Sequence, residues 1–126
     1  KRRKLFFKNY HNFFSTFVEN YKIEIPSIKK YSEINGHFYW ILVPKKLREK
    51  FIEKARLNFL ELTTHFEPLH NSKAGKFYGK YYENLDETTS LSRRLLRIPI
   101  HTQMSLKTQN SIIKILKKVT HECFDK

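Results

Sequence analysis

The sequence predicts a small α/β (α+β) domain, in which a short, mostly antiparallel sheet is packed by helices. Three observations support this class. Segments whose apolar residues recur every three or four positions alternate with short apolar runs bounded by glycine or proline. The chain has 126 residues, a length that suits one domain. Hydrophobic residues make up 40% of it and charged residues 29%, which is enough apolar material for a core and argues against an intrinsically disordered chain.

The first predicted element is an amphipathic helix over residues 5–21. Lys8 and Glu19 lie on its polar arc. Its apolar face carries Phe6, Tyr10, Phe13, Phe14, Phe17, Val18 and Tyr21. So many aromatic side chains on one face require a partner surface, which favours packing in a core or a seam over base stacking or membrane binding. Pro26 ends this unit.

The middle of the chain predicts a strand, a helix and a second strand. Residues 37–43 are aromatic and β-branched, lack alternation and are bounded by Gly36 and Pro44, so we expect a strand covered on both faces. Residues 45–59 predict a helix with Leu47, Phe51, Ala55 and Phe59 on its buried side. Residues 60–66 alternate weakly between apolar and polar side chains, which indicates a half-buried strand.

The last third begins with residues 67–86, a predicted loop that contains Pro68, Gly75 and Gly79, with Phe77 and several tyrosines set among lysines. Loops of this length inside a small domain are usually functional or disordered. Thr89 or Ser90 could cap a short helix through Leu96, and residues 97–100 would then be extended. The final helix is expected to start near an N-cap at Ser105 and to bury Ile112, Ile113, Leu116 and Val119.

The charge of the chain is its strongest compositional signal. It has 25 lysines and arginines against 12 acidic residues, a formal net charge of +13. Such an excess with interleaved tyrosines is typical of proteins that bind nucleic acid. The lysines are spread over every predicted helix instead of forming one stripe, and no known recognition motif is present. A small basic nucleic-acid-binding module is therefore kept as the alternative function.

Several other classes of function are disfavoured by the residues. Cys123 is the only cysteine, so the chain has no internal disulfide, and a reducing, cytoplasmic location fits best. Among the six histidines, His65 and His70 come nearest to a ligand pair, and we expect no metal site. Residues 38–43 form the longest apolar run, far shorter than the roughly 20 residues of a membrane-spanning helix. The sole methionine is Met104, so the sequence lacks an initiator methionine, and we expect it to be a fragment, a processed chain or an excised piece of a longer protein.

A resemblance to a known family rests on four groups of residues and on their order and spacing. The groups are Asn35-Gly36-His37-Phe38-Tyr39-Trp40-Ile41, then Thr64-His65-Phe66-Glu67-Pro68-Leu69-His70, then Ala74-Gly75, then Thr88-Thr89 and Ser92 with Arg94-Leu95-Leu96-Arg97-Ile98-Pro99. Together they resemble the carboxy-terminal small domain of the DegT/DnrJ group, which are pyridoxal-phosphate-dependent nucleotide-sugar aminotransferases of fold type I. By these motifs the most similar subgroup makes dTDP-4-amino-4,6-dideoxygalactose for lipopolysaccharide and other bacterial surface polysaccharides.

This resemblance implies an enzyme larger than the present chain. The Schiff-base lysine and most pyridoxal phosphate contacts of the family lie in a large amino-terminal domain, so no lysine here is assigned that role and this chain alone is expected to be inactive. Residues 1–25 would be an interdomain helix, whose aromatic face forms the seam toward the large domain, and residues 26–126 the small domain. The intact enzyme would be a homodimer that uses glutamate as amino donor and a 4-keto-6-deoxy nucleotide sugar as acceptor.

The resemblance also suggests which residues face the substrate. It places His37, His65 and His70 on the substrate side. His70 follows a stiffening proline and could meet a sugar hydroxyl or a phosphate, or it could cap local backbone. Arg94 and Arg97 are candidate contacts for a diphosphate, although an arginine beside a buried strand more often ties a carboxylate or carbonyl of its own domain.

Overall fold

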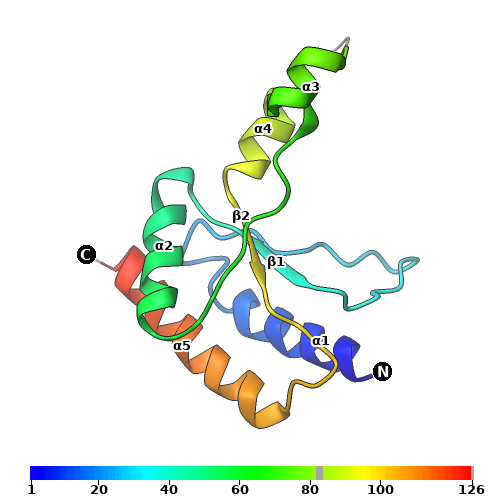
Figure 1. Ribbon diagram of the computed structural model, residues 1–126. Coiled ribbons are helices and arrows are strands. Elements are labelled where there is room, and N and C mark those ends of the chain that lie inside the picture. Colours follow the sequence, from blue (N-terminus) through cyan, green and yellow to red (C-terminus); the bar gives the residue numbers. More distant parts are fainter. Residues whose placement is uncertain (82–83, 126) are drawn as a thin grey trace.

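Two short strands lie at the centre of the fold, with helices from both ends of the chain packed below them (Figure 1). The computed structural model describes residues 1–81 and 84–125. The elements, in chain order, are α1 (Arg2–Ser15), β1 (Tyr39–Leu42), α2 (Lys45–Leu57), the single 3-10 turn η1 (Leu69–Asn71), α3 (Lys73–Tyr78), α4 (Asp86–Ser92), β2 (Leu95–Ile98) and α5 (Leu106–Phe124). The predicted class, helices with a small antiparallel sheet, is confirmed.

The sheet pairs β1 with β2 in antiparallel register, with Trp40 opposite Arg97. Each strand has one further bridge on its outer edge, Glu24 with Leu42 and Thr63 with Arg97. Because side chains alternate along a strand, the two faces differ in burial. One face enters the core through Tyr39, Ile41, Leu96 and Ile98, which are all fully buried. Trp40 and Arg97 lie on the other face and are half-buried, so only one face of β1 is fully covered.

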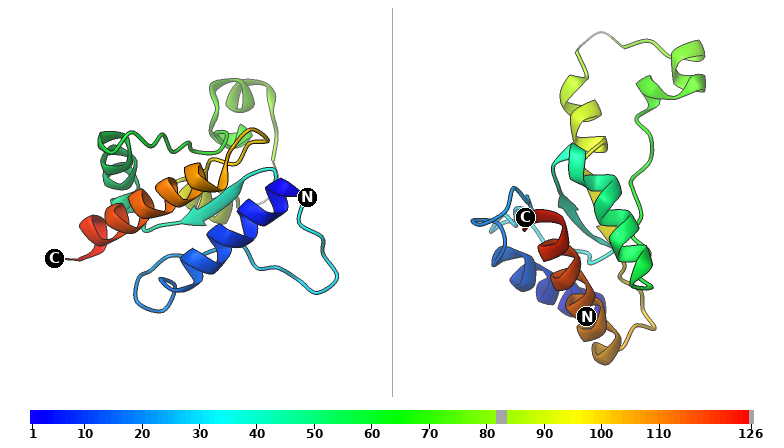
Figure 2. Two further views of the ribbon diagram at one scale, coloured as in Figure 1. Left: turned by 90° about the horizontal axis from the view of Figure 1, so that it is seen from below. Right: turned by 90° about the vertical axis from the view of Figure 1, so that its left-hand side faces the viewer.

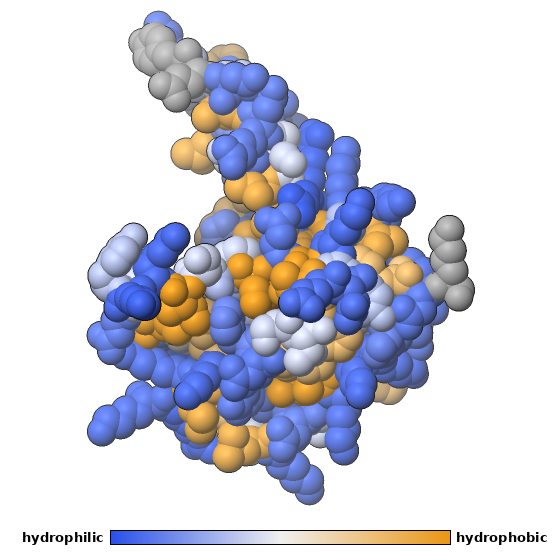
Figure 3. Space-filling view, turned by 180° about the vertical axis from the view of Figure 1, so that it is seen from behind, coloured by the Kyte–Doolittle hydropathy of each residue, from blue (hydrophilic) through white to orange (hydrophobic). Residues whose placement is uncertain are grey.

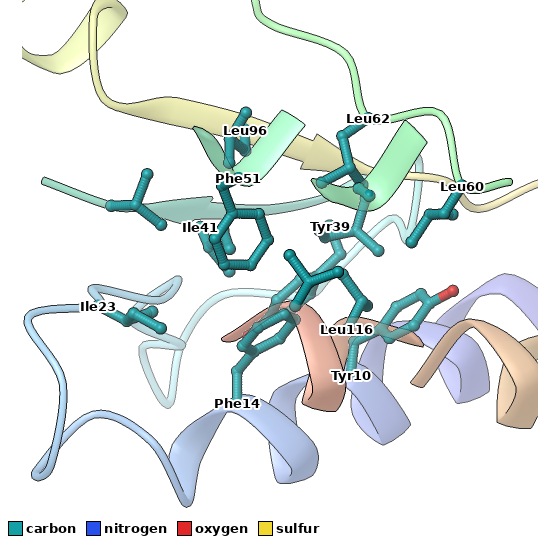
Figure 4. Close-up of a cluster of buried hydrophobic side chains, with 14 of the residues drawn as sticks. Tyr10, Phe14, Ile23, Tyr39, Ile41, Phe51, Leu60, Leu62, Leu96 and Leu116 are labelled. Atoms are coloured by element: carbon teal, nitrogen blue, oxygen red, sulfur yellow. The ribbon is translucent and has the colours of Figure 1, made fainter. Parts of the chain in front are cut away.

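The aromatic face of α1 belongs to the core of this chain. Phe6, Tyr10 and Phe14 are fully buried, and the ring of Phe14 stacks on Tyr39 of β1 with 5.8 Å between centroids. Figure 4 shows Tyr10 and Phe14 pointing from α1 toward Tyr39 and Leu116. The expectation that this face forms a seam toward a second domain is therefore wrong, because β1 and α5 already cover it. The core-packing alternative is confirmed.

Helix α5 closes the core from below and is tied to α1 by polar contacts. The predicted N-cap is confirmed, since the Ser105 hydroxyl oxygen accepts a hydrogen bond from the Thr108 backbone N–H at 3.0 Å. Gln109 is fully buried and donates to the carbonyl oxygen of Phe6 at 2.7 Å. Its amide oxygen accepts from the Asn9 side chain at 2.7 Å. Both ends of a buried amide are thus satisfied, and they fix the position of α5 against α1.

Several predicted elements differ from the observed ones. Helix α1 covers Arg2–Ser15 instead of residues 5–21. Helix α2 stops at Leu57, and Phe59 has a φ of 60° and is fully exposed, so it does not join the buried side with Phe51. The predicted strand over residues 60–66 is wrong. Leu60 and Leu62 are buried, but only Thr63 pairs with the sheet, and the backbone then leaves it, which exposes Phe66.

The described residues of the segment 64–93 project from the body as an arm in Figure 1 and in the right-hand view of Figure 2. The predicted loop over residues 67–86 contains η1 and α3, and its residues 82–83 lie outside the described part. Helix α4 begins at Asp86, before the predicted caps, and Leu95 and Leu96 belong to β2 instead of the helix. None of the described residues between 63 and 95 is buried, so the arm adds nothing to the core.

Candidate functional site

The ring of Phe38 gathers three of the predicted site residues. It lies 5.5 Å from the His37 ring and 6.0 Å from the His65 ring, measured between centroids. The guanidinium carbon of Arg97 lies 4.4 Å from the same centroid. These four residues, His37, Phe38, His65 and Arg97, are called the Phe38 cluster below. The structure therefore brings together side chains from the entry to β1, from β2 and from the segment that follows the Thr63 bridge.

A tight turn places His37 at the edge of this cluster. Gly36 has a φ of 64° and is buried, and a Cβ there would lie 2.8 Å from the carbonyl carbon of Arg3 in α1. The side-chain oxygen of Asn35 accepts the backbone N–H of His37 at 2.9 Å, which closes the turn. Since only glycine adopts this conformation without strain, the Asn35-Gly36 pair sets where His37 leaves the surface of α1.

One hydrogen-bond donor of Arg97, its Nε, has no partner among the described residues. The Arg97 guanidinium lies over the Phe38 ring in a cation–π contact. Within the described part of the chain, its Nε is buried and has no hydrogen-bond partner. Leaving such a donor unpaired costs free energy, so the position favours an acceptor such as a phosphate or carboxylate oxygen.

A polar cleft adjoins the Phe38 cluster at His65. It has a volume of about 490 Å³ and lies between the start of α2, the segment after Thr63 and the end of α4. Its lining residues are Arg48, Thr64, His65, Phe66, Glu67, Pro68, Asn71, Lys76, Ser92 and Arg93. Arg48 donates to the carbonyl oxygen of Ser92 at 3.0 Å and pairs with Glu49.

The charge of this cleft suits an anion. Among the described residues, neither Lys76 nor Arg93 pairs with a carboxylate, and Glu67 is the single acidic residue of the lining. Ammonium and guanidinium groups that converge on one polar hollow are the usual protein ligands of phosphate. Sequence reasoning missed Arg48, Lys76 and Arg93, because they are distant in the chain and form no motif.

His70 and Arg94 lie apart from the Phe38 cluster. His70 sits in the arm, where its Nε2 and the Thr89 hydroxyl are 2.8 Å apart, and Asn71 donates to the same hydroxyl at 3.2 Å. Thr89 thereby joins η1 to α4, and His70 contacts a side chain instead of capping backbone. Arg94 donates to the carbonyl oxygen of Val43 at 3.4 Å and pairs with Glu24, so it ties groups of its own domain.

Every lysine that the structure describes is exposed except Lys54. Lys54 is half-buried and lies 3.8 Å from a carboxylate oxygen of Glu122. Across residues 1–81 and 84–125, no three His, Cys, Asp or Glu side chains gather where they could hold a metal ion. No helix described is long and apolar enough to cross a bilayer.

The fold and the cationic cleft define a class, a small α/β domain with a polar hollow beside its sheet. Comparison with models of protein families identifies the family within this class. The model of the DegT/DnrJ/EryC1/StrS aminotransferase family matches residues 1–117. The chain therefore belongs to this family.

Solved structures show the same fold. The chain is similar to the aminotransferase TlmJ from Streptoalloteichus hindustanus, with a TM-score of 0.82, 17% identity and coverage of 96% of this chain and 31% of that one. It is similar to DesV from S. venezuelae, solved in complex with a ketimine intermediate, with a TM-score of 0.76, 17% identity and coverage of 93% and 30%. NtdA from Bacillus subtilis, with bound cofactor PMP, gives a TM-score of 0.76, 16% identity and coverage of 93% and 27%.

This chain corresponds to only part of each of these solved chains. The chain spans between 27% and 31% of these three solved chains, while they cover nearly all of it. At these identities the likeness shows the fold alone. The fold of this chain is thus that of one part of an aminotransferase of fold type I.

Proposed function

We propose that this chain is the carboxy-terminal small domain of a pyridoxal-phosphate-dependent aminotransferase that transfers an amino group from glutamate to a 4-keto-6-deoxy nucleotide sugar. The observation that carries the proposal is the family match over residues 1–117 of a chain that covers about 31% of TlmJ. The motif resemblance favours dTDP-4-amino-4,6-dideoxygalactose as product, made for lipopolysaccharide or another surface polysaccharide. The intact enzyme would be a cytoplasmic homodimer.

In this proposal the polypeptide is divided by role. Residues 1–25, whose helix α1 packs in the core of this chain, would lead from the large domain into the small domain of residues 26–126, while a large domain outside this chain holds pyridoxal phosphate. When bound there, the cofactor supplies the electron sink for amino transfer. The present chain supplies binding and orientation of the sugar nucleotide and, when the domains meet, exclusion of water.

The polar cleft is the proposed seat of the substrate diphosphate. Arg93 and Lys76 supply charges that no carboxylate of the described residues neutralises, and Arg48 is oriented by the Ser92 carbonyl. Binding energy from a diphosphate, which does not react, can position the keto sugar at the catalytic centre. His65 lines the cleft and also belongs to the Phe38 cluster, which contains Arg97.

The histidines have distinct roles in this proposal. His37 and His65 are exposed and flank Phe38, so each can donate a hydrogen bond to a sugar hydroxyl or a phosphate oxygen. His70 forms a hydrogen bond with Thr89 and so stabilises the arm, and Arg94 forms an ion pair with Glu24. We therefore expect substrate binding to depend on His65 more than on His70.

A kinetic comparison tests the proposal. In the longer polypeptide, Arg93→Gln should raise KM for the nucleotide sugar about tenfold or more, the value of a charge-assisted hydrogen bond, and leave kcat nearly unchanged. The matched control is Arg56→Gln, because Arg56 is exposed at the end of α2 and does not line the cleft. Equal KM values for the two variants would refute the cleft as the diphosphate site. A longer polypeptide without amino transfer to any keto nucleotide sugar would refute the function.

A further inference from the structure

A large hollow lies where the start of α2 meets the end of α5 and the segment that follows α1. It has a volume of about 1140 Å³ and is lined by residues 20–22, 44–47, 50 and 123–125. This hollow is called the α2–α5 groove below. It shares no lining residue with the polar cleft at His65, so it is a second hollow of the same domain.

Apolar side chains form part of the α2–α5 groove. Tyr21, Leu47 and Phe124 line it and are half-buried, so each keeps part of its surface accessible. The rings of Tyr21 and Phe124 lie against each other, with 4.9 Å between their centroids. Apolar patches between hydrophilic side chains are ordinary on a protein surface, and Figure 3 shows several on one face of this molecule. The charge around the groove therefore decides what it can bind.

Four lysines and a single carboxylate line the groove. The lysines, all exposed, are Lys22, Lys45, Lys46 and Lys50. Among the described residues, none of them pairs with an acidic side chain. The carboxylate is that of Asp125, which accepts a hydrogen bond from Tyr21 at 2.6 Å and lies 2.8 Å from Nδ1 of His121. Both of its oxygens thus have partners, and the lining keeps four positive charges against one negative charge.

These positive charges do not help the fold. Like charges around one hollow repel one another, which destabilises the compact state. Lys45 and Lys46 also lie in the first turn of α2, which contains no acidic residue, and the helix dipole disfavours positive charge at that end. An anion bound in the groove would relieve both effects, so the charge pattern favours an anionic ligand.

The size and lining of the groove select the class of anion. Pockets for molecules of drug or cofactor size have volumes of about 300–1,000 Å³, so a hollow of this order exceeds what one phosphate fills. Ammonium groups bind phosphates as point charges. Exposed aromatic surfaces stack on flat bases. A nucleoside triphosphate carries both parts, a flat base and a compact group of negative charges.

We propose that the α2–α5 groove binds a nucleoside triphosphate, with the phosphates against Lys46 and Lys50 and the base against Tyr21 and Phe124. Lys46 and Lys50 lie four residues apart in α2, so they share one face of the helix. Lys22 and Lys45 complete the positive lining of the groove. The site does not depend on the amino transfer proposed above, because none of its residues lines the polar cleft.

Isothermal titration of the 126-residue chain with ATP tests this site. The double variant Lys46→Gln with Lys50→Gln should bind ATP about tenfold or more weakly at equal ionic strength, because it lacks two charge-assisted contacts. The matched control is Lys114→Gln with Lys117→Gln. It removes the same charge from exposed positions of α5 outside the groove and should bind ATP as the wild type does.

Inorganic tripolyphosphate separates the two parts of the site, because it has at least the charge of ATP but no base. Stacking of the base should make ATP bind about tenfold more tightly than tripolyphosphate. Equal affinities for the two would overturn the assignment of a nucleoside. A wild-type chain that binds no ATP at millimolar concentration would overturn the site itself.

The variants separate this groove from other anion sites. Equal losses of ATP affinity in the groove variant and the α5 control would mean non-specific attraction and would overturn the proposal. A loss in the polar-cleft variant Lys76→Gln with Arg93→Gln, with the groove variant unaffected, would place the anion in that cleft and would also overturn it. A loss confined to the groove variant would support it, whether or not the longer polypeptide transfers amino groups.

Discussion

Replacing Phe14 with alanine tests whether the aromatic face of α1 belongs to the core of this chain. Phe14 is fully buried, stacks on Tyr39 and makes an edge contact with Phe13 at 4.8 Å between centroids. Truncating a buried phenylalanine removes its transfer free energy and leaves a cavity, which together lower the free energy of unfolding by about 3–5 kcal/mol. A small domain has only about 5–15 kcal/mol in total, so the loss is large.

Thermal unfolding followed by circular dichroism measures this effect on the 126-residue chain. For a domain of this size the expected fall in Tm is roughly 10–20 °C, at about 3–4 °C per kcal/mol. Phe77→Ala is the control, because 79% of Phe77 is exposed and its removal should change stability by less than about 0.5 kcal/mol. A Phe14→Ala chain as stable as the control would refute the reasoning, since it would mean that the face of α1 is not packed against β1.

Three further predictions follow from single features of the structure. Gly36→Ala should lower the free energy of unfolding by about 2–4 kcal/mol, through a left-handed alanine and its contact with the backbone of Arg3; a loss too small to detect in urea titration would contradict this. Hydrogen bonds from Tyr21 and His121 hold the pKa of Asp125 below its ordinary 3.8, so they stabilise the fold above that pH and the gain is lost as pH falls through the lower, folded value. The Tm difference between wild type and Asp125→Asn should therefore shrink below about pH 3.8, and a constant difference down to pH 2 would be inconsistent with it. The dispersed charge of +13 should give duplex DNA binding only at low salt, whereas tight binding at physiological salt would favour the nucleic-acid alternative.

Elements with local signals were predictable from the sequence. The strand around Tyr39 lies between Gly36 and Pro44, and α5 begins at the predicted cap Ser105. Caps and breakers act through neighbouring backbone groups, so their effect does not depend on the rest of the fold. The aromatic period of α1 was equally clear, although periodicity alone could not tell a core from an interface.

The arm was not predictable in the same way. Helix α3 has no buried residue, so its sequence carries no hydrophobic periodicity that would predict a helix. Its one local signal is Ser72 three residues before Gly75, a cap that a short helix shares with many turns. The strand predicted over residues 60–66 is wrong because the alternation of apolar and polar residues continues to Phe66, whereas the chain leaves the sheet after Thr63.

The candidate site was predictable in its members but not in its geometry. His37, His65 and Arg97 were named from the sequence, yet their meeting at Phe38 depends on the pairing of Arg97 with Thr63. Such pairings between distant segments are tertiary and leave no trace in local spacing. The cationic residues that line the cleft come from α2, α3 and the end of α4, so they are far apart in the sequence and form no motif.

The most direct test of the proposed function measures amino transfer from glutamate to a dTDP-4-keto-6-deoxy sugar by mass spectrometry of the product. The longer polypeptide is compared with the same polypeptide lacking residues 1–126 and with the 126-residue chain alone. We predict product from the complete polypeptide and none from either part. Undiminished product without residues 1–126, or turnover by this chain unaided, would contradict the role proposed for it.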